Sequence, residues 1–168
     1  MINFTVPVLT IFVKTYLLAL CLCFPPPGYC QQVPLIKLDQ LFQRIHAGRD
    51  TTFVVDFWAT WCVPCVQELP GFDSLTLAHR NDKVKVLLVS VDFKSQLKTA
   101  VLPFVKGRGI QSPVFLLDEQ DQQVYIDRID STWSGAIPAT LIVKNNTRRF
   151  FEKEFTYPAL ETEYQKIQ

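Results

Sequence analysis

The segment TTFVVDFWA, residues 51–59, constrains the fold most strongly, because a cysteine pair follows it directly. This short segment is rich in β-branched and aromatic residues and has few polar interruptions, which is typical of a buried central strand. Cys62 and Cys65 come next, and residues 62–80 predict a helix. A strand that leads through such a junction into a helix indicates an α/β layer structure.

The remaining pattern predicts further helices and strands. Residues 38–48 have apolar side chains at helical spacing, with Asp39 as a candidate N-cap and Gly48 as a C-terminal stop. Other predicted segments are a second buried strand at 83–92, a helix at 95–109 bent at Pro103, two strands at 113–118 and 122–128 that pair around a polar turn, a hairpin at 139–155 turning at Asn145-Asn146, and a short amphipathic helix at 158–167. The order predicts a mixed sheet flanked by helices.

The first thirty residues differ in composition from the rest of the chain. They contain one charge, Lys14, followed by the apolar run TYLLALCLCF and then PPPGYC. This order predicts a secretory leader that is cleaved between Cys30 and Gln31, with an uncleaved membrane anchor as the alternative. We therefore expect one domain over residues 31–168. Charges in that domain balance, which favours neither a nucleic-acid surface nor an anionic-membrane surface.

If the leader is removed, Cys62 and Cys65 are the only cysteines of the domain. A structural zinc site usually needs four ligands, and His46 and His79 fall in separate predicted helices, so no metal is expected. The pair also closes too small a loop to stabilise the fold as a staple. At a helix start, backbone N–H groups and the helix dipole favour a thiolate at Cys62, and Cys65 lies one turn later on the same face. This arrangement predicts a redox pair, with Cys62 as nucleophile and Cys65 as resolving thiol.

The segment VVDFWATWCVPC resembles the active-site segment of the thioredoxin superfamily. Pro70, five residues after Cys65, matches the proline inside the following helix, and GAIPAT resembles the loop with the family's cis-proline, which would be Pro138. The resemblance covers residues 34–168. It implies an α/β thioredoxin-like fold, with a central mixed β-sheet and flanking helices.

Within the superfamily, the chain is most similar to the exported TlpA-like and ResA-like thiol-disulfide oxidoreductases. The leader, the segment FWATWCVPC with Glu68 after it, and an inserted helix-strand region at about 95–125, before the cis-proline loop, support this branch. Asp56 departs from it, because many members of the branch have asparagine there. Asp56 resembles instead the buried aspartate of cytoplasmic thioredoxins.

We expect roles for residues around the pair. A carboxylate at Asp56, inside an apolar strand, must be paired or have a raised pKa, and it can accept the proton of Cys65. Glu68 lies one turn after Cys65 and is expected to border the same cavity. The expected substrate-contacting residues are Trp61, Val63, Pro64, Ile137 and Pro138, with the backbone of Ile137 pairing with an extended segment.

We expect a monomeric enzyme, and no bound cofactor is implied. The leader implies that it acts outside the cytoplasm, in the periplasm or another extracytoplasmic compartment. It would exchange electrons with protein thiols and disulfides, mostly as a reductant. A membrane electron donor would keep it reduced, and its targets would include cytochrome c apoproteins.

Two alternatives remain. A thiol peroxidase of the same fold is one, although peroxiredoxins carry a Pro-rich Thr-x-x-Cys segment and Thr60 lies two residues before Cys62. A non-catalytic binding module is the other, and the intact Cys62, Cys65 and Pro138 argue against it.

Overall fold

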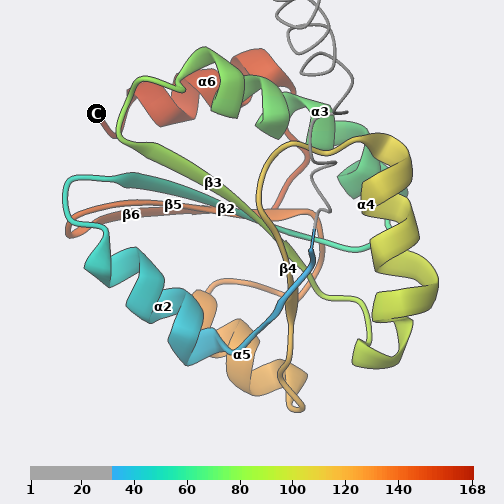
Figure 1. The fold of residues 1–168 in the computed structure, drawn as a ribbon. Helices are drawn as coiled ribbons and strands as arrows, with labels where there is room; N and C mark the ends of the chain where they lie inside the picture. The colour runs from blue at the N-terminus through green and yellow to red at the C-terminus, as the bar shows by residue number, and fades with distance from the viewer. Residues whose placement is uncertain (1–31) are drawn as a thin grey trace, which may run out of the picture. The chain divides into compact units, whose positions relative to one another are not determined.

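The computed structural model describes residues 32–168, in which six strands form one mixed sheet (Figure 1). The strands in chain order are β1 (Leu35–Ile36), β2 (Thr52–Trp58), β3 (Val84–Ser90), β4 (Val114–Leu117), β5 (Ala139–Lys144) and β6 (Thr147–Phe151). Their order across the sheet is β1-β4-β3-β2-β5-β6. β2 pairs parallel with β3 and antiparallel with β5, and every residue of β2 is buried. The prediction of a buried central strand is confirmed.

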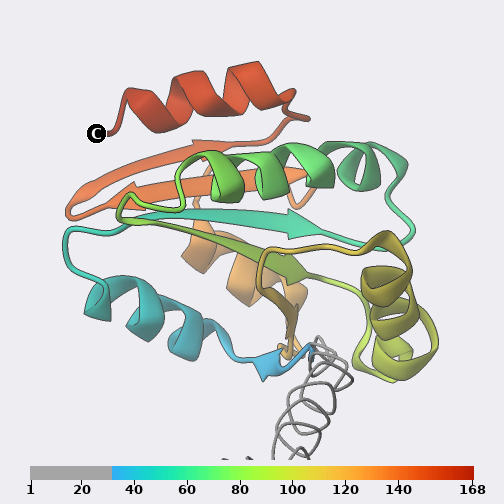
Figure 2. The same ribbon diagram turned by 45° about the horizontal axis from the view of Figure 1, so that its top comes forward.

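Helices cover both faces of this sheet (Figures 1 and 2). The helices are α2 (Leu38–Ala47), α3 (Val63–Ala78), α4 (Leu102–Arg108), α5 (Gln122–Ile129) and α6 (Tyr157–Gln165). One core cluster joins one sheet face to α3, α4 and α6, for example through Phe72, Val105 and Leu160. A second cluster joins the opposite face to α2 and α5, for example through Leu41 and Ile129.

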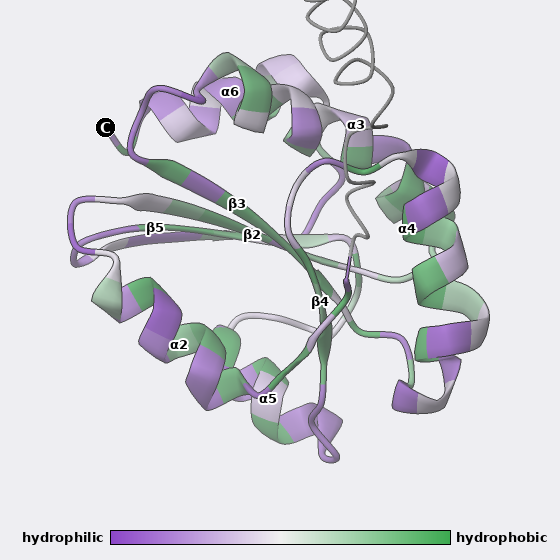
Figure 3. Ribbon diagram, in the orientation of Figure 1, coloured by the Kyte–Doolittle hydropathy of each residue, from purple (hydrophilic) through white to green (hydrophobic). Residues whose placement is uncertain are grey.

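Alternation along β2 explains why two cores form. Val54 and Trp58 belong to the cluster beneath α3, whereas Val55 and Phe57 belong to the opposite cluster. Successive side chains of a strand point to opposite faces, so a continuous apolar run supplies both layers. Figure 3 shows the central strands coloured mainly as hydrophobic, between helices that contain both hydrophobic and hydrophilic residues. The predicted α/β class and mixed sheet are confirmed.

The predicted start of the first helix needs correction. Asp39 lies in the first turn of α2, and Lys37 is the N-cap residue. The backbone N–H of Leu38 donates to Glu119 Oε1 at 2.7 Å, a partner far away in sequence. Asp39 was favoured because aspartate commonly caps helices, but a distant carboxylate satisfies this end. The C-terminal stop is confirmed, since the Gly48 N–H donates to the Ile45 carbonyl at 3.2 Å.

The prediction that residues 122–128 form a strand paired with 113–118 was wrong. Residues Gln122–Ile129 form α5, whose N-cap Asp121 accepts a hydrogen bond from the Val124 N–H at 3.3 Å. Tyr125 and Ile129 lie one helical turn apart and are buried against the sheet. β4 could not take this segment as a partner, because β1 and β3 already occupy its two edges.

The other predicted helices and strands are present, whereas the predicted bend at Pro103 stays a prediction. Residues 94–108 are helical, with a 3₁₀ turn (η1, Lys94–Gln96) and a π-helical segment (η2, Leu97–Val101) leading into α4, where Pro103 lies in the first turn. Asn145 has a φ of 54° in the β5–β6 turn, and α6 forms at the C-terminus. None of the helices within residues 32–168 has the length and hydropathy needed to cross a membrane. The predicted leader lies outside the described residues.

Candidate active site

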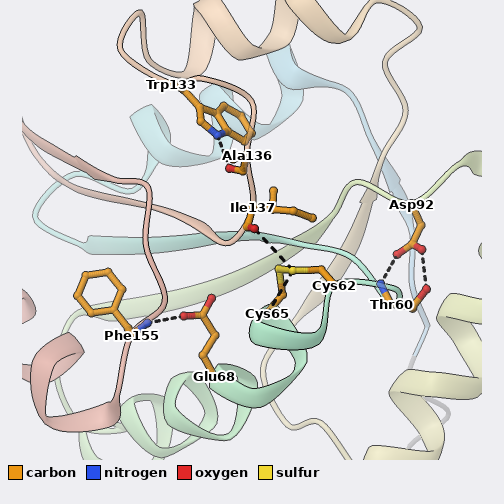
Figure 4. Close-up of a disulfide and its surroundings, with 9 residues drawn as sticks. All are labelled: Thr60, Cys62, Cys65, Glu68, Asp92, Trp133, Ala136, Ile137 and Phe155. Carbon is orange, nitrogen blue, oxygen red and sulfur yellow. Dashed lines mark hydrogen bonds between the residues drawn. A yellow bond between two sulfur atoms is a disulfide. The ribbon is translucent and has the colours of Figure 1, made fainter.

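The cysteine pair forms a disulfide at the junction between β2 and α3 (Figure 4). Cys62 is the N-cap of α3, and its sulfur accepts a hydrogen bond from the Cys65 N–H at 3.3 Å. Pro64 fits in the first turn, where its missing N–H costs no helical hydrogen bond. Cys62 keeps 6% of its surface exposed, whereas Cys65 is fully buried. Of the two sulfurs, the partially exposed Cys62 also lies nearest the helix N-terminus, where a thiolate is stabilised.

The loop before β5 faces this disulfide. The peptide bond between Ile137 and Pro138 is cis, and the Ile137 carbonyl oxygen lies 3.7 Å from Cys62 Sγ. Pro138 is buried and Ile137 is half-buried. The Trp133 Nε1–H donates to the Ala136 carbonyl at 2.7 Å, which ties the loop to a cluster of aromatic rings (Figure 4). The fold thus brings residue 137, from a remote part of the sequence, to the sulfur.

Two buried carboxyl groups lie behind the disulfide. Asp56 stands between Val54 and Trp58 in the strand alternation, so it points to the face covered by α3 and Cys65. Glu68 is buried on α3, and its Oε2 accepts a hydrogen bond from the Phe155 N–H at 2.6 Å (Figure 4). Within residues 32–168, both carboxyl oxygens of Asp56 and the Oε1 atom of Glu68 are buried without a hydrogen-bond donor.

This setting raises the proton affinity of both groups. Burial raises the pKa of Asp56 well above its ordinary 3.8, and the nearby charge of Glu68 raises it further. Burial also raises the pKa of Glu68 from 4.5 to about 7, although the hydrogen bond from Phe155 opposes that shift. Two carboxyl groups that interact in an apolar core can each gain a hydrogen-bond partner by sharing a proton. The pair can therefore store and release a proton beside the redox centre.

The tryptophans near the pair have different places. Trp61 is 62% exposed beside the disulfide, whereas Trp58 is fully buried and packs its ring against Phe104. Val63 is also exposed, at the start of α3. Trp61 and Val63 are exposed next to Cys62 and form an apolar surface around its sulfur, which is itself only slightly accessible.

Sequence reasoning missed the role of Asp92. This buried carboxylate accepts hydrogen bonds from the Thr60 N–H at 2.9 Å, the Thr60 hydroxyl at 2.6 Å and the Ser90 hydroxyl at 2.7 Å (Figure 4 shows the two from Thr60). It fastens the loop that carries Trp61 and Cys62 to the end of β3. An acidic residue at the end of a predicted buried strand was the available signal, but the sequence did not indicate that Thr60 in the neighbouring loop is its partner.

Known proteins show which family this site belongs to. The sequence matches the AhpC/TSA family over residues 31–148, which is more than half of the chain. The chain belongs to the AhpC/TSA family. This family membership places it in the thioredoxin superfamily, as the sequence predicted.

Individual relatives narrow the assignment. This AhpC/TSA member is 31% identical to the sporulation thiol-disulfide oxidoreductase A of Bacillus subtilis, over 64% of the chain and 68% of that protein. It is 29% identical to the thiol-disulfide oxidoreductase ResA of Geobacillus kaustophilus, over 61% of the chain and 54% of that protein. The chain thus spans only about half the length of the second relative. The predicted branch, the thiol-disulfide oxidoreductases, is confirmed.

A solved structure supports the fold independently. The thioredoxin-related protein of Neisseria meningitidis serogroup B superposes with a TM-score of 0.61 at 19% identity, over 71% of this chain and 86% of that one. At this identity the likeness concerns the fold alone. The predicted thioredoxin-like fold is confirmed.

Proposed function

We propose that this domain exchanges two electrons with protein cysteines through Cys62 and Cys65, acting mostly as a reductant. The observation that supports this most directly is the position of the disulfide. It caps α3, its accessible sulfur lies 3.7 Å from the Ile137 carbonyl, and buried carboxyl groups lie behind it. An inert structural disulfide requires none of these features.

The reductive reaction runs from the dithiol form. The Cys62 thiolate attacks one sulfur of a substrate disulfide, which breaks the substrate S–S bond and releases one substrate thiolate that takes up a proton. Cys65, as thiolate, then attacks Cys62 Sγ, which breaks the mixed disulfide and expels the second substrate sulfur as a thiolate that also takes up a proton. The substrate disulfide has gained two electrons and two protons, and the domain ends in the disulfide form described above.

Asp56 and Glu68 accept the proton of Cys65 and return it. Cys65 is fully buried, so its proton needs an internal acceptor when the thiol attacks. Asp56 faces the same covered side of the sheet, and its raised pKa makes it a stronger base than an ordinary aspartate. Glu68 accepts or returns the proton through its interaction with Asp56. In this proposal, both carboxyl groups are part of the catalytic machinery.

Substrate contacts fall on the surface around Cys62. Trp61 and Val63 are exposed, Pro64 is half-buried and Ile137 offers its backbone to an extended segment, whereas buried Pro138 shapes the loop from within. We assign these residues to substrate binding.

We further propose that residues 1–30 form a secretory leader or a membrane anchor and that residues 31–168 work as a monomer outside the cytoplasm. The leader-like composition of residues 1–30 supports export, and 31–168 form one compact unit. Substrates would be protein disulfides, cytochrome c apoproteins among them, and a membrane electron donor would regenerate the dithiol.

A pair of cysteine variants tests the reaction. We expect Cys62→Ser to abolish reduction of a protein disulfide such as insulin. Cys65→Ser should keep the first attack and lose the second, so that a mixed disulfide with the substrate accumulates and is visible by mass spectrometry. Undiminished turnover in Cys62→Ser would overturn the proposal. A measured reduction potential decides the direction, because an oxidant would lie near about −120 mV and a reductant much lower.

The same preparations separate the alternatives. A thiol peroxidase would consume hydrogen peroxide rapidly in stopped-flow experiments. The Thr60 hydroxyl, for its part, donates a hydrogen bond to Asp92. A binding module with an inert disulfide would show a potential below about −300 mV together with no turnover.

A further inference from the structure

A cavity of about 290 Å³ opens beside the disulfide, on the side of the cis-proline loop. Its walls come from five separate parts of the fold. Aromatic and aliphatic side chains line it: Trp61, Phe93, Leu117, Tyr125, Trp133 and Ile137. Trp61 and Ile137 place one side of the cavity next to Cys62, and Gln122 and Tyr125 of α5 form another part of its wall.

The cavity has an open apolar mouth. Phe93 is 74% exposed and Trp61 is 62% exposed, while Tyr125 and Trp133 are buried at its inner end. Large exposed aromatic side chains beside a concave apolar site are typical of surfaces that bind a partner. Ile137 lines this cavity and its carbonyl oxygen lies 3.7 Å from Cys62 Sγ, so a chain that pairs with the Ile137 backbone lies next to the cavity.

The charges around the cavity are unequal. Three carboxylates line it, from Asp92, Asp118 and Glu119, against one ammonium group, from Lys94. Asp92 accepts hydrogen bonds from Thr60 and Ser90. Asp118 forms ion pairs with Lys94 and Lys37. Glu119 uses Oε1 to accept the Leu38 N–H, and within residues 32–168 its Oε2 has no hydrogen-bond partner. When Lys37 is counted, three carboxylates stand against two ammonium groups, and the one excess negative charge suits a cationic side chain.

We propose that this cavity is a specificity subsite for the protein substrate: it receives a large apolar or aromatic side chain close to the substrate cysteine, with a basic residue next to it at the rim. This inference rests on the proposed function, since the substrate cysteine must reach Cys62. The aromatic lining selects the inserted side chain, and the carboxylates select the neighbouring charge.

A set of peptide disulfides tests the subsite. Each peptide has one cysteine and is joined to a second copy by its disulfide. One residue precedes the cysteine and one follows it, and these two are Trp and Lys (Trp-Lys), Trp and Glu (Trp-Glu) or two glycines (Gly-Gly). The prereduced protein converts each to two thiols in a single turnover, followed by quenching and chromatography. Because burial of an aromatic side chain is favourable, we expect Trp-Lys to react at least about tenfold faster than Gly-Gly. It should react roughly threefold faster than Trp-Glu.

Rim variants locate the effect. Phe93→Ala should remove most of the preference for Trp over Gly, and this residue is too exposed for its loss to prevent folding. Gln122→Lys adds a positive charge at the cavity and should remove the preference for Lys over Glu. Gln123→Lys is the matched control: it adds the same charge to the same helix outside the cavity and should keep the wild-type preference.

The outcomes separate the two proposals. Equal rates for all peptides, or a preference that survives both Phe93→Ala and Gln122→Lys, overturn the subsite and leave the redox function intact. If the prereduced protein reduces none of the peptides and also fails to reduce a small aromatic disulfide, the proposed function itself is overturned.

Discussion

At the scale of single residues, Glu68 makes the stability of the oxidised domain depend on pH. Its pKa rises from 4.5 to about 7 in the folded protein, chiefly because it is buried. The folded state therefore binds this proton more tightly than the unfolded state. The resulting stabilisation is complete below about pH 4.5 and is lost as pH rises to about 7. One pKa unit corresponds to about 1.4 kcal/mol, so the loss is roughly 3 kcal/mol.

We expect Glu68→Gln to flatten this dependence, because glutamine keeps an oxygen for the Phe155 N–H but does not titrate. Urea unfolding at about pH 5 and about pH 8 measures the difference between variant and wild type. Asp127→Asn, an exposed carboxyl-to-amide change on α5, is the control and should leave the wild-type slope unchanged. Equal slopes in Glu68→Gln and wild type would contradict the assigned proton.

At the scale of elements, Asp92 holds the β2–α3 loop against the end of β3. Asp92→Ala leaves the Thr60 N–H, the Thr60 hydroxyl and the Ser90 hydroxyl without this acceptor. Losing a buried acceptor from several donors costs about 2–3 kcal/mol, and the loop that carries Cys62 loses its anchor. We expect a corresponding drop in the free energy of unfolding, measured in urea, and slower disulfide exchange.

Asp118→Ala provides the comparison for Asp92→Ala. Asp118 also borders the cavity, but it pairs with two exposed lysines at the surface. Exposed ion pairs contribute about 1 kcal/mol or less, so stability should change little. If both variants lose the same stability, the anchoring role of Asp92 is wrong.

At the scale of the whole molecule, residues 31–168 contain both core clusters on the two faces of one sheet. A domain of this size usually unfolds in one cooperative step. We expect a chain beginning at Gln31 to be monomeric by gel filtration, to melt in a single transition and to keep the reduction potential of the full chain. Several transitions, or a shifted potential, would show that residues 1–30 contribute to the fold or to the site.

Several features of the fold and site could be predicted from short stretches of sequence. The strand of residues 52–58, the helix after it and the turn at Asn145 depend on local patterns of apolar and turn-forming residues. The prediction for residues 122–128 failed because their apolar residues suit either a strand or a helix over so short a run. The occupied edges of β4 decided between the two.

The sequence alone therefore determined the chemical centre: a cysteine pair at a strand-to-helix junction, with an acidic residue in the strand before it and a proline loop later in the chain. Only the tertiary structure decided how that centre is surrounded. It brought Ile137 to Cys62, buried Asp56 and Glu68 in one core, and fastened Thr60 to Asp92. The physical reason is that helix and strand signals act over a few residues. Burial, proton affinity and cavity shape depend instead on residues that meet only when the sheet and its helices assemble.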